Sequence, residues 1–289
     1  MKISLMTMTM FMRMYFSFKC DQEMEALKEN YEEMMELVAN AGYDMVDVTN
    51  IETQLFSVPY IEEVLKKNGL RVSSYIYMDQ FANEQRRIEQ IENAKQGVRD
   101  AVALGTKVLM LVPHAHEGIE KFSSKEVHAE LVKQWSPIAD YAKKFGMHTV
   151  IEDTPDLKLY LCSADELKEI LQAVPNLEVV YDSANMLLVD EDPIAYYDTF
   201  ADKTAHIHVK DIVFSPPTAP FGDIRADGRR MTGVFLGHGL VDLKTVLEHV
   251  VENKYDGCLS VEFVADEALG YEQSLIRNKE YIEKMIALS

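Results

Sequence analysis

Short apolar runs alternate with longer amphipathic segments along the whole chain, and this alternation limits the possible folds more than any other feature. Eight of the runs read as strands, and each is followed by a segment with helical spacing or helix-capping signals. The runs are short and rich in Val, Ile and Leu, which is typical of parallel strands covered on both faces. The expected strands lie at residues 2–9, 45–48, 70–77, 107–112, 147–153, 177–182, 205–210 and 258–263.

Eight strand–helix pairs predict an α/β protein, a (β/α)8 TIM barrel that forms a single domain over residues 1–289. A doubly wound open sheet is the alternative. Such a sheet usually has fewer strands in a chain of this length, and it would favour a glycine-rich phosphate loop after the first strand, which this sequence lacks. With 47% hydrophobic residues the chain can fill one large core, and no linker-like segment divides it.

Four side chains with ligand chemistry lie at the ends of apolar runs in the second half of the chain: Glu152, Asp182, His208 and Glu262. In a closed parallel barrel the strand C-termini open onto one face, where the active sites of this architecture lie. Taken singly, each residue could be a helix N-cap or a solvated loop residue. Together they predict a site for one divalent metal ion, with Mn²⁺ the first choice and Mg²⁺, Co²⁺ or Zn²⁺ compatible.

Such a cation can chelate an α-hydroxycarbonyl compound and stabilise an ene-diolate formed from it. Proton transfer on either side of that intermediate needs a base and an acid, and we assign Glu152 and Glu262 to these roles. The chain is therefore expected to be a metal-dependent isomerase or epimerase of a sugar or sugar phosphate. The same enolate could expel a β-hydroxyl group, so a dehydratase (lyase) of a keto-inositol or related cyclic ketone is the alternative. A non-catalytic barrel subunit is the third reading, and the presence of all four ligand residues argues against it.

Several motifs carry a resemblance to a known family: VIED around Glu152, YDSAN around Asp182, HIHVKD around His208, GHGLVD at 237–242 and GCLSVEF ending just after Glu262. On these motifs the sequence resembles the xylose isomerase-like superfamily of sugar (phosphate) isomerases and epimerases, which includes ketose 3-epimerases, hydroxypyruvate isomerase and inosose dehydratase. The resemblance implies that the Glu, Asp, His and Glu bind one metal ion and that the two Glu exchange substrate protons. It also implies that the second His of HIH is the ligand, so His206 is expected to point elsewhere.

Four further residues are candidates for substrate binding. Asn185 stands where many members of the superfamily place a substrate-contacting His, and an amide could also bind a hydroxyl group. Lys210 completes an HxHxKD pattern that resembles the inosose dehydratase-like and phosphate-handling branches and departs from the free-ketose epimerases. His114 follows the fourth strand on the same predicted rim. Arg225 could contact an anionic substrate group.

Residues 211–241 form a connection of about thirty residues rich in Pro and Gly, which is unusually long for a compact domain. We expect this loop to cover the substrate or to contact another subunit.

Charge and composition restrict the possible partners. Lys and Arg total 29 against 48 Asp and Glu, a net charge of −19 that opposes nucleic acid binding. The apurinic-site endonucleases of the same superfamily also need extra metal ligands that this sequence mostly lacks. The apolar start of the chain contains Lys2 and Arg13 and has neither a membrane span nor a signal-peptide cleavage site. We therefore expect a cytoplasmic homo-oligomer whose partner is a small-molecule carbohydrate.

Overall fold

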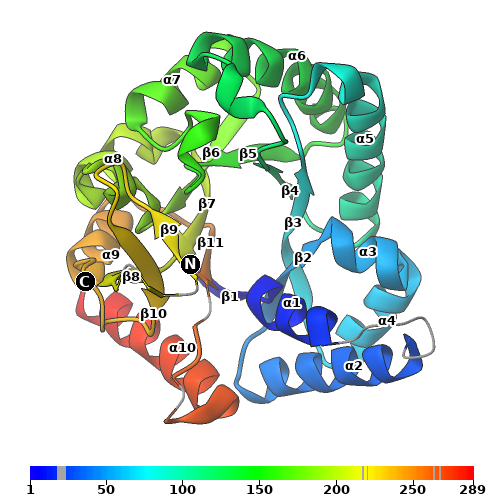
Figure 1. The fold of residues 1–289 in the computed structure, drawn as a ribbon. Coiled ribbons are helices and arrows are strands. Elements are labelled where there is room, and N and C mark those ends of the chain that lie inside the picture. The colour runs from blue at the N-terminus through cyan, green and yellow to red at the C-terminus, as the bar shows by residue number, and fades with distance from the viewer. Residues whose placement is uncertain (18–23, 217, 220, 263, 267) are drawn as a thin grey trace.

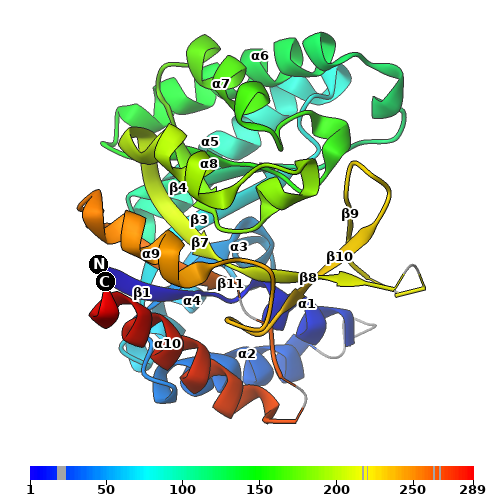
Figure 2. The same ribbon diagram turned by 90° about the vertical axis from the view of Figure 1, so that its left-hand side faces the viewer.

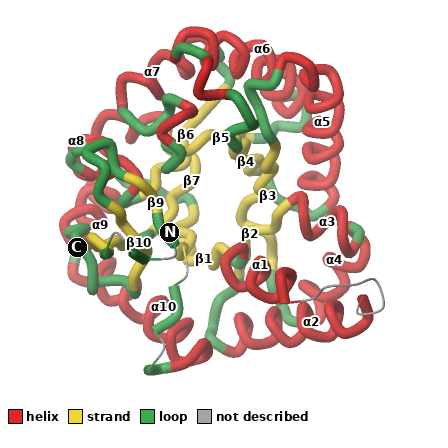
Figure 3. The backbone as a smooth tube through the Cα atoms, in the orientation of Figure 1, coloured by secondary structure: helices red, strands yellow, loops and turns green. Residues whose placement is uncertain are grey.

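A closed barrel of parallel strands forms the centre of the computed structural model, which describes residues 1–17, 24–216, 218–219, 221–262, 264–266 and 268–289. Figures 1 and 3 show the strands as an inner ring with the helices outside it. The order around the barrel is β1-β11-β7-β6-β5-β4-β3-β2, so the predicted TIM barrel is confirmed. The barrel strands are β1 (Lys2–Met6), β2 (Met45–Thr49), β3 (Arg71–Asp79), β4 (Val108–Pro113), β5 (His148–Glu152), β6 (Leu177–Asp182), β7 (Thr204–Val209) and β11 (Cys258–Glu262).

The outer helices follow the strands much as their apolar spacing predicts. A capping box of Ser163 and Glu166 opens α7, and each side chain accepts a hydrogen bond from the other residue's backbone N–H. The main core fills the layer between the strands and the helices and includes Trp135 and Tyr31, both fully buried. The helices of this layer are α2 (Met24–Asn40), α4 (Val58–Lys67), α5 (Arg87–Ala103), α6 (Ser124–Lys143), α7 (Ala164–Ala173), α8 (Pro193–Phe200), α9 (Leu243–Glu252) and α10 (Gly270–Leu288). Among the described residues, no helix combines the length and the apolarity needed to cross a bilayer.

Two helices at the C-terminal end of the barrel were not expected from the sequence. The first strand ends at Met6, where its pairing with β11 ends opposite Glu262, and α1 (Met8–Ser17) occupies residues that were assigned in part to that strand. Helix α3 (Asn50–Phe56) follows β2 directly. It begins in a capping box in which the Thr49 hydroxyl accepts from the Glu52 N–H and the Glu52 carboxylate accepts from the Thr49 N–H.

The connection 211–241 was expected as a loop, but it contains a small antiparallel sheet of order β8-β10-β9. Its strands are β8 (Asp211–Ser215), β9 (Asp223–Ile224) and β10 (Arg230–Val234). Figure 2 shows this sheet at the end of the barrel opposite the two termini. We call residues 211–241 the excursion.

One buried carboxylate closes the excursion. Asp211 Oδ2 accepts the N–H groups of Gly237 and Gly239, at 3.0 and 2.8 Å, and Asp211 Oδ1 accepts that of Val241 at 3.1 Å. A Cβ on Gly239 would lie 2.0 Å from Asp211 Oδ1, so a side chain at this position would displace the carboxylate. The start and the end of the excursion are thus held at the same point.

The inside of the barrel is divided into an apolar part and a polar part. Ile76, Met110, Val150 and Val180, from β3 to β6, form a buried cluster with Met6. The strands β2, β7 and β11 contribute polar side chains, which are also buried: Asp47, His206, His208 and Ser260. This division continues to the mouth of the barrel, where the candidate site lies.

Candidate metal centre and substrate cavity

Three of the four predicted ligand residues meet at the C-terminal end of the barrel. The register of β6 and β7 places Asp182 opposite His208, and β5 ends at Glu152. His208 Nδ1 lies 2.6 Å from Glu152 Oε1. One ligand atom from each of Glu152, Asp182 and His208 lies within 4.8 Å of the other two, a grouping that can hold a metal ion.

The donor atoms of this group fit a cation. Asp182 Oδ1 accepts the N–H groups of Ala184 and Asn185, both at 2.8 Å, whereas the buried Asp182 Oδ2 has no hydrogen-bond partner in the described residues. Burial raises the pKa of Asp182 to about 7; Lys210 opposes the rise, and the charges of Glu152 and Glu262 add to it. A divalent ion would relieve the repulsion among these carboxylates and satisfy the unpartnered oxygen.

His208 lies between two carboxylates. Its Nδ1 faces Glu152, and its Nε2 lies 3.7 Å from Asp47 Oδ2. Burial lowers the pKa of His208, but the two carboxylates outweigh burial and hold this pKa well above its ordinary value. A metal ion on the Nδ1 side would take the place of a proton there and leave Nε2–H directed at Asp47.

Asp47 is not among the residues expected from the sequence. Its carboxylate is fully buried in the barrel and accepts hydrogen bonds from the Ser73 and Ser260 hydroxyls, each at 2.5 Å. Burial would raise the pKa of Asp47, but the His206 and His208 imidazoles hold it well below its ordinary value. The only signal in the sequence was an acidic residue inside the apolar strand MVDV.

His206 lies outside the group around Glu152 but still faces the barrel interior. It lies on the same interior face as His208, with the two rings edge to face at 5.3 Å, and its Nε2 is 3.6 Å from Asp47 Oδ2. The period-2 alternation of β7 explains why the two imidazoles share a face.

Glu262 stands apart from the three-residue group. It lines the same cavity, but its Oε1 lies 3.1 Å from the ammonium of Lys210. Its role as a metal ligand and as half of the acid/base pair stays a prediction.

A cavity of about 920 Å³ opens above the metal centre, and three of the predicted substrate-binding residues line it: His114, Asn185 and Lys210. Asn185 Oδ1 accepts from Lys210 Nζ at 3.1 Å, which directs both side chains along the same wall. Arg225 is not part of the lining. Its guanidinium pairs with Asp190 at 2.5 Å and Asp227 at 3.2 Å, so this placement does not support the prediction that it binds substrate.

The excursion contributes to the cavity through residues that the sequence analysis did not single out. Gly222, Asp223 and Ile224, at β9, line the cavity opposite the barrel strands. Burial raises the pKa of Asp223, and Lys210 opposes this rise. The expectation that this segment covers a substrate stays a prediction.

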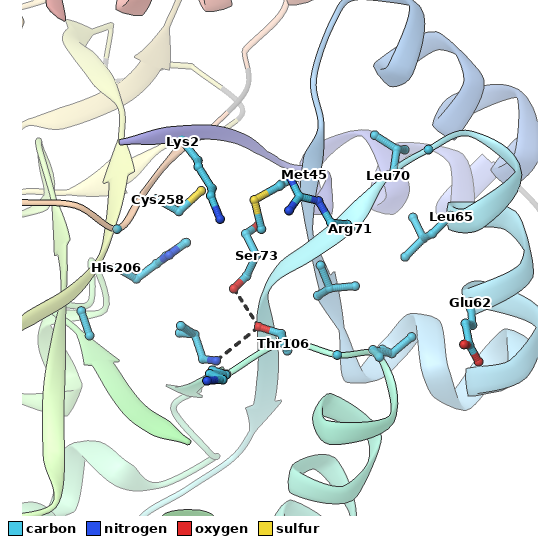
Figure 4. A pocket seen from close by; sticks show the side chains of 18 of the residues that line it. Lys2, Met45, Glu62, Leu65, Leu70, Arg71, Ser73, Thr106, His206 and Cys258 are labelled. Carbon is cyan, nitrogen blue, oxygen red and sulfur yellow. Dashed lines mark hydrogen bonds between the residues drawn. The ribbon is translucent and has the colours of Figure 1, made fainter. Parts of the chain in front are cut away.

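A second cavity, of about 820 Å³, lies at the N-terminal end of the barrel strands. Figure 4 shows Lys2, Arg71, Ser73 and His206 around it. Of the three residues grouped around the candidate metal centre, none lines this cavity. Glu152 and His208 instead line the cavity at the C-terminal end.

Comparison with known proteins identifies the family. Residues 35–285 match the protein family described as "Xylose isomerase-like TIM barrel". The chain belongs to this family. Within the xylose isomerase-like TIM barrels, it is 24% identical over 214 residues to fructoselysine 3-epimerase from Shigella flexneri, covering 73% of this chain and 70% of that protein. It is 22% identical over 284 residues to inosose dehydratase from Clostridium beijerinckii, and the match covers 89% of this chain and 91% of that protein. The crystal structure of the IOLI protein with a binding zinc atom has the same fold, with a TM-score of 0.72 and 17% identity. The match covers 100% of this chain and 99% of that chain.

Proposed function

We propose that this chain is a divalent-metal-dependent isomerase or epimerase that transfers protons next to the carbonyl group of a sugar or sugar phosphate. One observation carries the proposal: Glu152 and Glu262 line the same cavity from β5 and β11, and the strands of Asp182 and His208 lie between them. Two carboxylates on either side of a metal centre can reach different faces or different carbons of one substrate.

Each residue has a role in this scheme. Glu152 takes the proton from the carbon next to the carbonyl group, and Glu262 returns a proton to the other face or to the neighbouring carbon. Lys210, 3.1 Å from Glu262 Oε1, stabilises negative charge that develops on a substrate oxygen. His114 and Asn185 bind hydroxyl groups.

The metal would be held by Glu152, Asp182, His208 and Glu262, and Mn²⁺ is our first choice because oxygen donors predominate. When bound, the ion would act as a Lewis acid that polarises the substrate carbonyl. The homo-oligomeric state and the cytoplasmic location belong to the proposal as well.

A dehydratase is the second candidate, because the family relatives include inosose dehydratase over 89% of this chain. The two reactions share the first proton transfer. They differ in whether the intermediate is reprotonated or loses a β-hydroxyl group as water.

Incubation of ketoses and keto-inositols with Mn²⁺-loaded protein in D₂O, followed by NMR, tests the proposal. We expect deuterium to enter next to the carbonyl group together with an isomerised or epimerised product. Glu152→Gln and Glu262→Gln should each lower kcat by about 10² or more, since general acid/base groups contribute about this much. Glu89→Gln, on an exposed helix face, is the control. Full activity in both variants would reject the two-carboxylate mechanism, and loss of water from the substrate would assign the chain as a dehydratase.

A further inference from the structure

The cavity above the metal centre has two unlike walls. One wall comes from the ends of β5, β7 and β11 and from the residue after β7, and it carries the polar residues Glu152, His208, Lys210 and Glu262. The facing wall comes from β1, α1, α3, β3 and β4, and Figure 1 shows α1 and α3 on this side of the barrel. Its side chains are largely apolar and include Met6, Met8, Met12, Ile51, Met78 and Met110. We call these six residues the methionine wall.

Local structure explains how this wall forms. Met8 and Met12 lie one turn apart on α1, so both reach the cavity, whereas Met10 and Phe11 of the same helix are buried in the core. Ile51 lies in the first turn of α3. The wall thus continues the apolar half of the barrel interior outward to the solvent.

The methionine wall carries little charge. His114, which follows β4, is the titratable side chain beside it, and burial lowers the pKa of His114, which disfavours a positive charge there. A cavity of about 920 Å³ is also near the upper end of the range for pockets that hold drug-sized ligands, about 300–1,000 Å³. It is larger than the polar centre needs to bind a hydroxyketone.

A free sugar presents hydroxyl groups on all sides. Against the methionine wall those hydroxyls would lose water without gaining hydrogen bonds, which is unfavourable. An apolar group placed there would be buried with a favourable free energy. The flexible thioether side chains can adapt to a ring or to an alkyl chain.

We propose that the substrate is a polyhydroxylated ketone bearing an apolar substituent, about the size of one aromatic ring, that packs against the methionine wall. This inference rests on the proposed function, because the ketone is placed at the metal centre by that function. The hydroxyketone part faces Glu152 and Glu262, and the apolar part faces Met8, Met12 and Met78.

Dihydroxyacetone and its monobenzyl ether test the inference, because they share the hydroxyketone group and differ in one aromatic ring. We expect Mn²⁺-loaded protein to bind the ether about tenfold or more tightly in calorimetric titrations, the gain for burying one such ring. Equal affinity for the two compounds would overturn the inference.

Variants show where the ring binds. Met78→Gln keeps the side-chain length but makes it polar, and it should reduce the ratio of the two affinities several-fold. Met24→Gln, on α2 outside the cavity lining, should leave the ratio unchanged. If Met78→Gln left the ratio of the two affinities unchanged, the inference would also be overturned.

Deuterium entry into the same two compounds separates this inference from the proposed function. Absence of deuterium next to the carbonyl group in both compounds, with the affinity ratio preserved, would reject the proton-transfer function and retain the apolar subsite. Deuterium entry with equal affinities would retain the function and reject the subsite.

Discussion

Lys210 Nζ lies 3.1 Å from Glu262 Oε1, so in this structure an ammonium group occupies the side of the Glu262 carboxylate that faces Asn185. Burial lowers the pKa of Lys210, but Glu262, Asp182 and Glu152 outweigh burial and hold this pKa above its ordinary value. The candidate metal centre therefore has a positive charge of its own beside it, and a divalent ion bound there would lie next to this charge.

Replacing Lys210 tests this relationship. Lys210→Met should tighten Mn²⁺ binding by about tenfold or more, because the repulsion between the ammonium and the ion is removed from a poorly solvated site. Turnover should fall, because the same ammonium stabilises charge on the substrate. Calorimetric titration with Mn²⁺ measures the change in metal affinity. Lys158→Met is the control, because Lys158 is an exposed lysine that lines the same cavity. Weaker metal binding in Lys210→Met would contradict the argument.

Asp182 allows its structural and metal-binding roles to be separated. In Asp182→Asn the amide oxygen can still accept the N–H groups of Ala184 and Asn185, while the unpartnered Oδ2 is replaced by an NH₂ group. We expect an unchanged thermal midpoint within a few degrees and Mn²⁺ affinity lowered by at least about tenfold. Asp156→Asn, at the same cavity, is the control. Undiminished metal occupancy in folded Asp182→Asn would remove Asp182 from the ligand set.

Asp47 should act on the metal through His208. Asp47→Asn removes the carboxylate that faces His208 Nε2, so the imidazole loses its orienting partner, and metal affinity should fall about 10–100-fold. His206→Asn is the matched control, because His206 contacts the same carboxylate but lies outside the group around Glu152. If both variants lost stability and neither lost metal affinity in the folded protein, the buried polar residues would be purely structural.

The titration of Glu52 should make the free energy of unfolding of this protein depend on pH. Burial raises its pKa from the ordinary value of 4.5 to about 7, although Thr49 N–H and Tyr31 O–H donate to its carboxylate. Between these two values the folded chain holds a proton that the unfolded chain releases. The free energy of unfolding should therefore fall as pH rises from 4.5 to 7, by about 1.4 kcal/mol per unit and about 3 kcal/mol in all.

Glu52→Gln removes this titration and keeps an acceptor for the α3 capping box. Urea unfolding between pH 4.5 and 8 should show a smaller decline in the variant than in the wild type, so the variant is the more stable protein above pH 7. Glu166→Gln changes the equivalent capping box of α7 at a less buried position and serves as the control. An identical pH profile for Glu52→Gln and the wild type would exclude Glu52 as the source.

Local patterns predicted the barrel and brought together three residues of the candidate metal centre. The strands of Glu152, Asp182 and His208 are apolar runs that end at a ligand-type side chain, and strand ends in a parallel barrel converge whatever the helices between them contain. The expected strand 177–182 matches β6.

The features that were missed depend on contacts between distant parts of the chain. Asp47 meets His208 across the barrel interior, and Lys210 pairs with Glu262 on the neighbouring strand β11. Within the described residues, the pairing of β1 with β11 ends at Met6 and Glu262, and helix α1 takes up the rest of the expected first strand. Arg225 is held by an ion pair with Asp190, which follows β6. Asp190 belongs to none of the sequence motifs, so this pairing could not be predicted.

The hydrogen bonds of the Asp211 carboxylate affect which part of the sequence can change during evolution without disturbing the barrel. Because Asp211 is the first residue of the excursion and its carboxylate accepts hydrogen bonds from the residues that lead back to α9, the segment between them is a closed insertion. The entropy cost of closing a loop grows slowly with its length, so residues between β8 and β10 can be gained, lost or exchanged at little cost to the barrel. Glu152, Asp182 and His208 would stay in register while the surface that covers the substrate changed. Divergence of specificity in a lineage built this way would then be concentrated in one segment, 216–229, and would leave the metal chemistry intact.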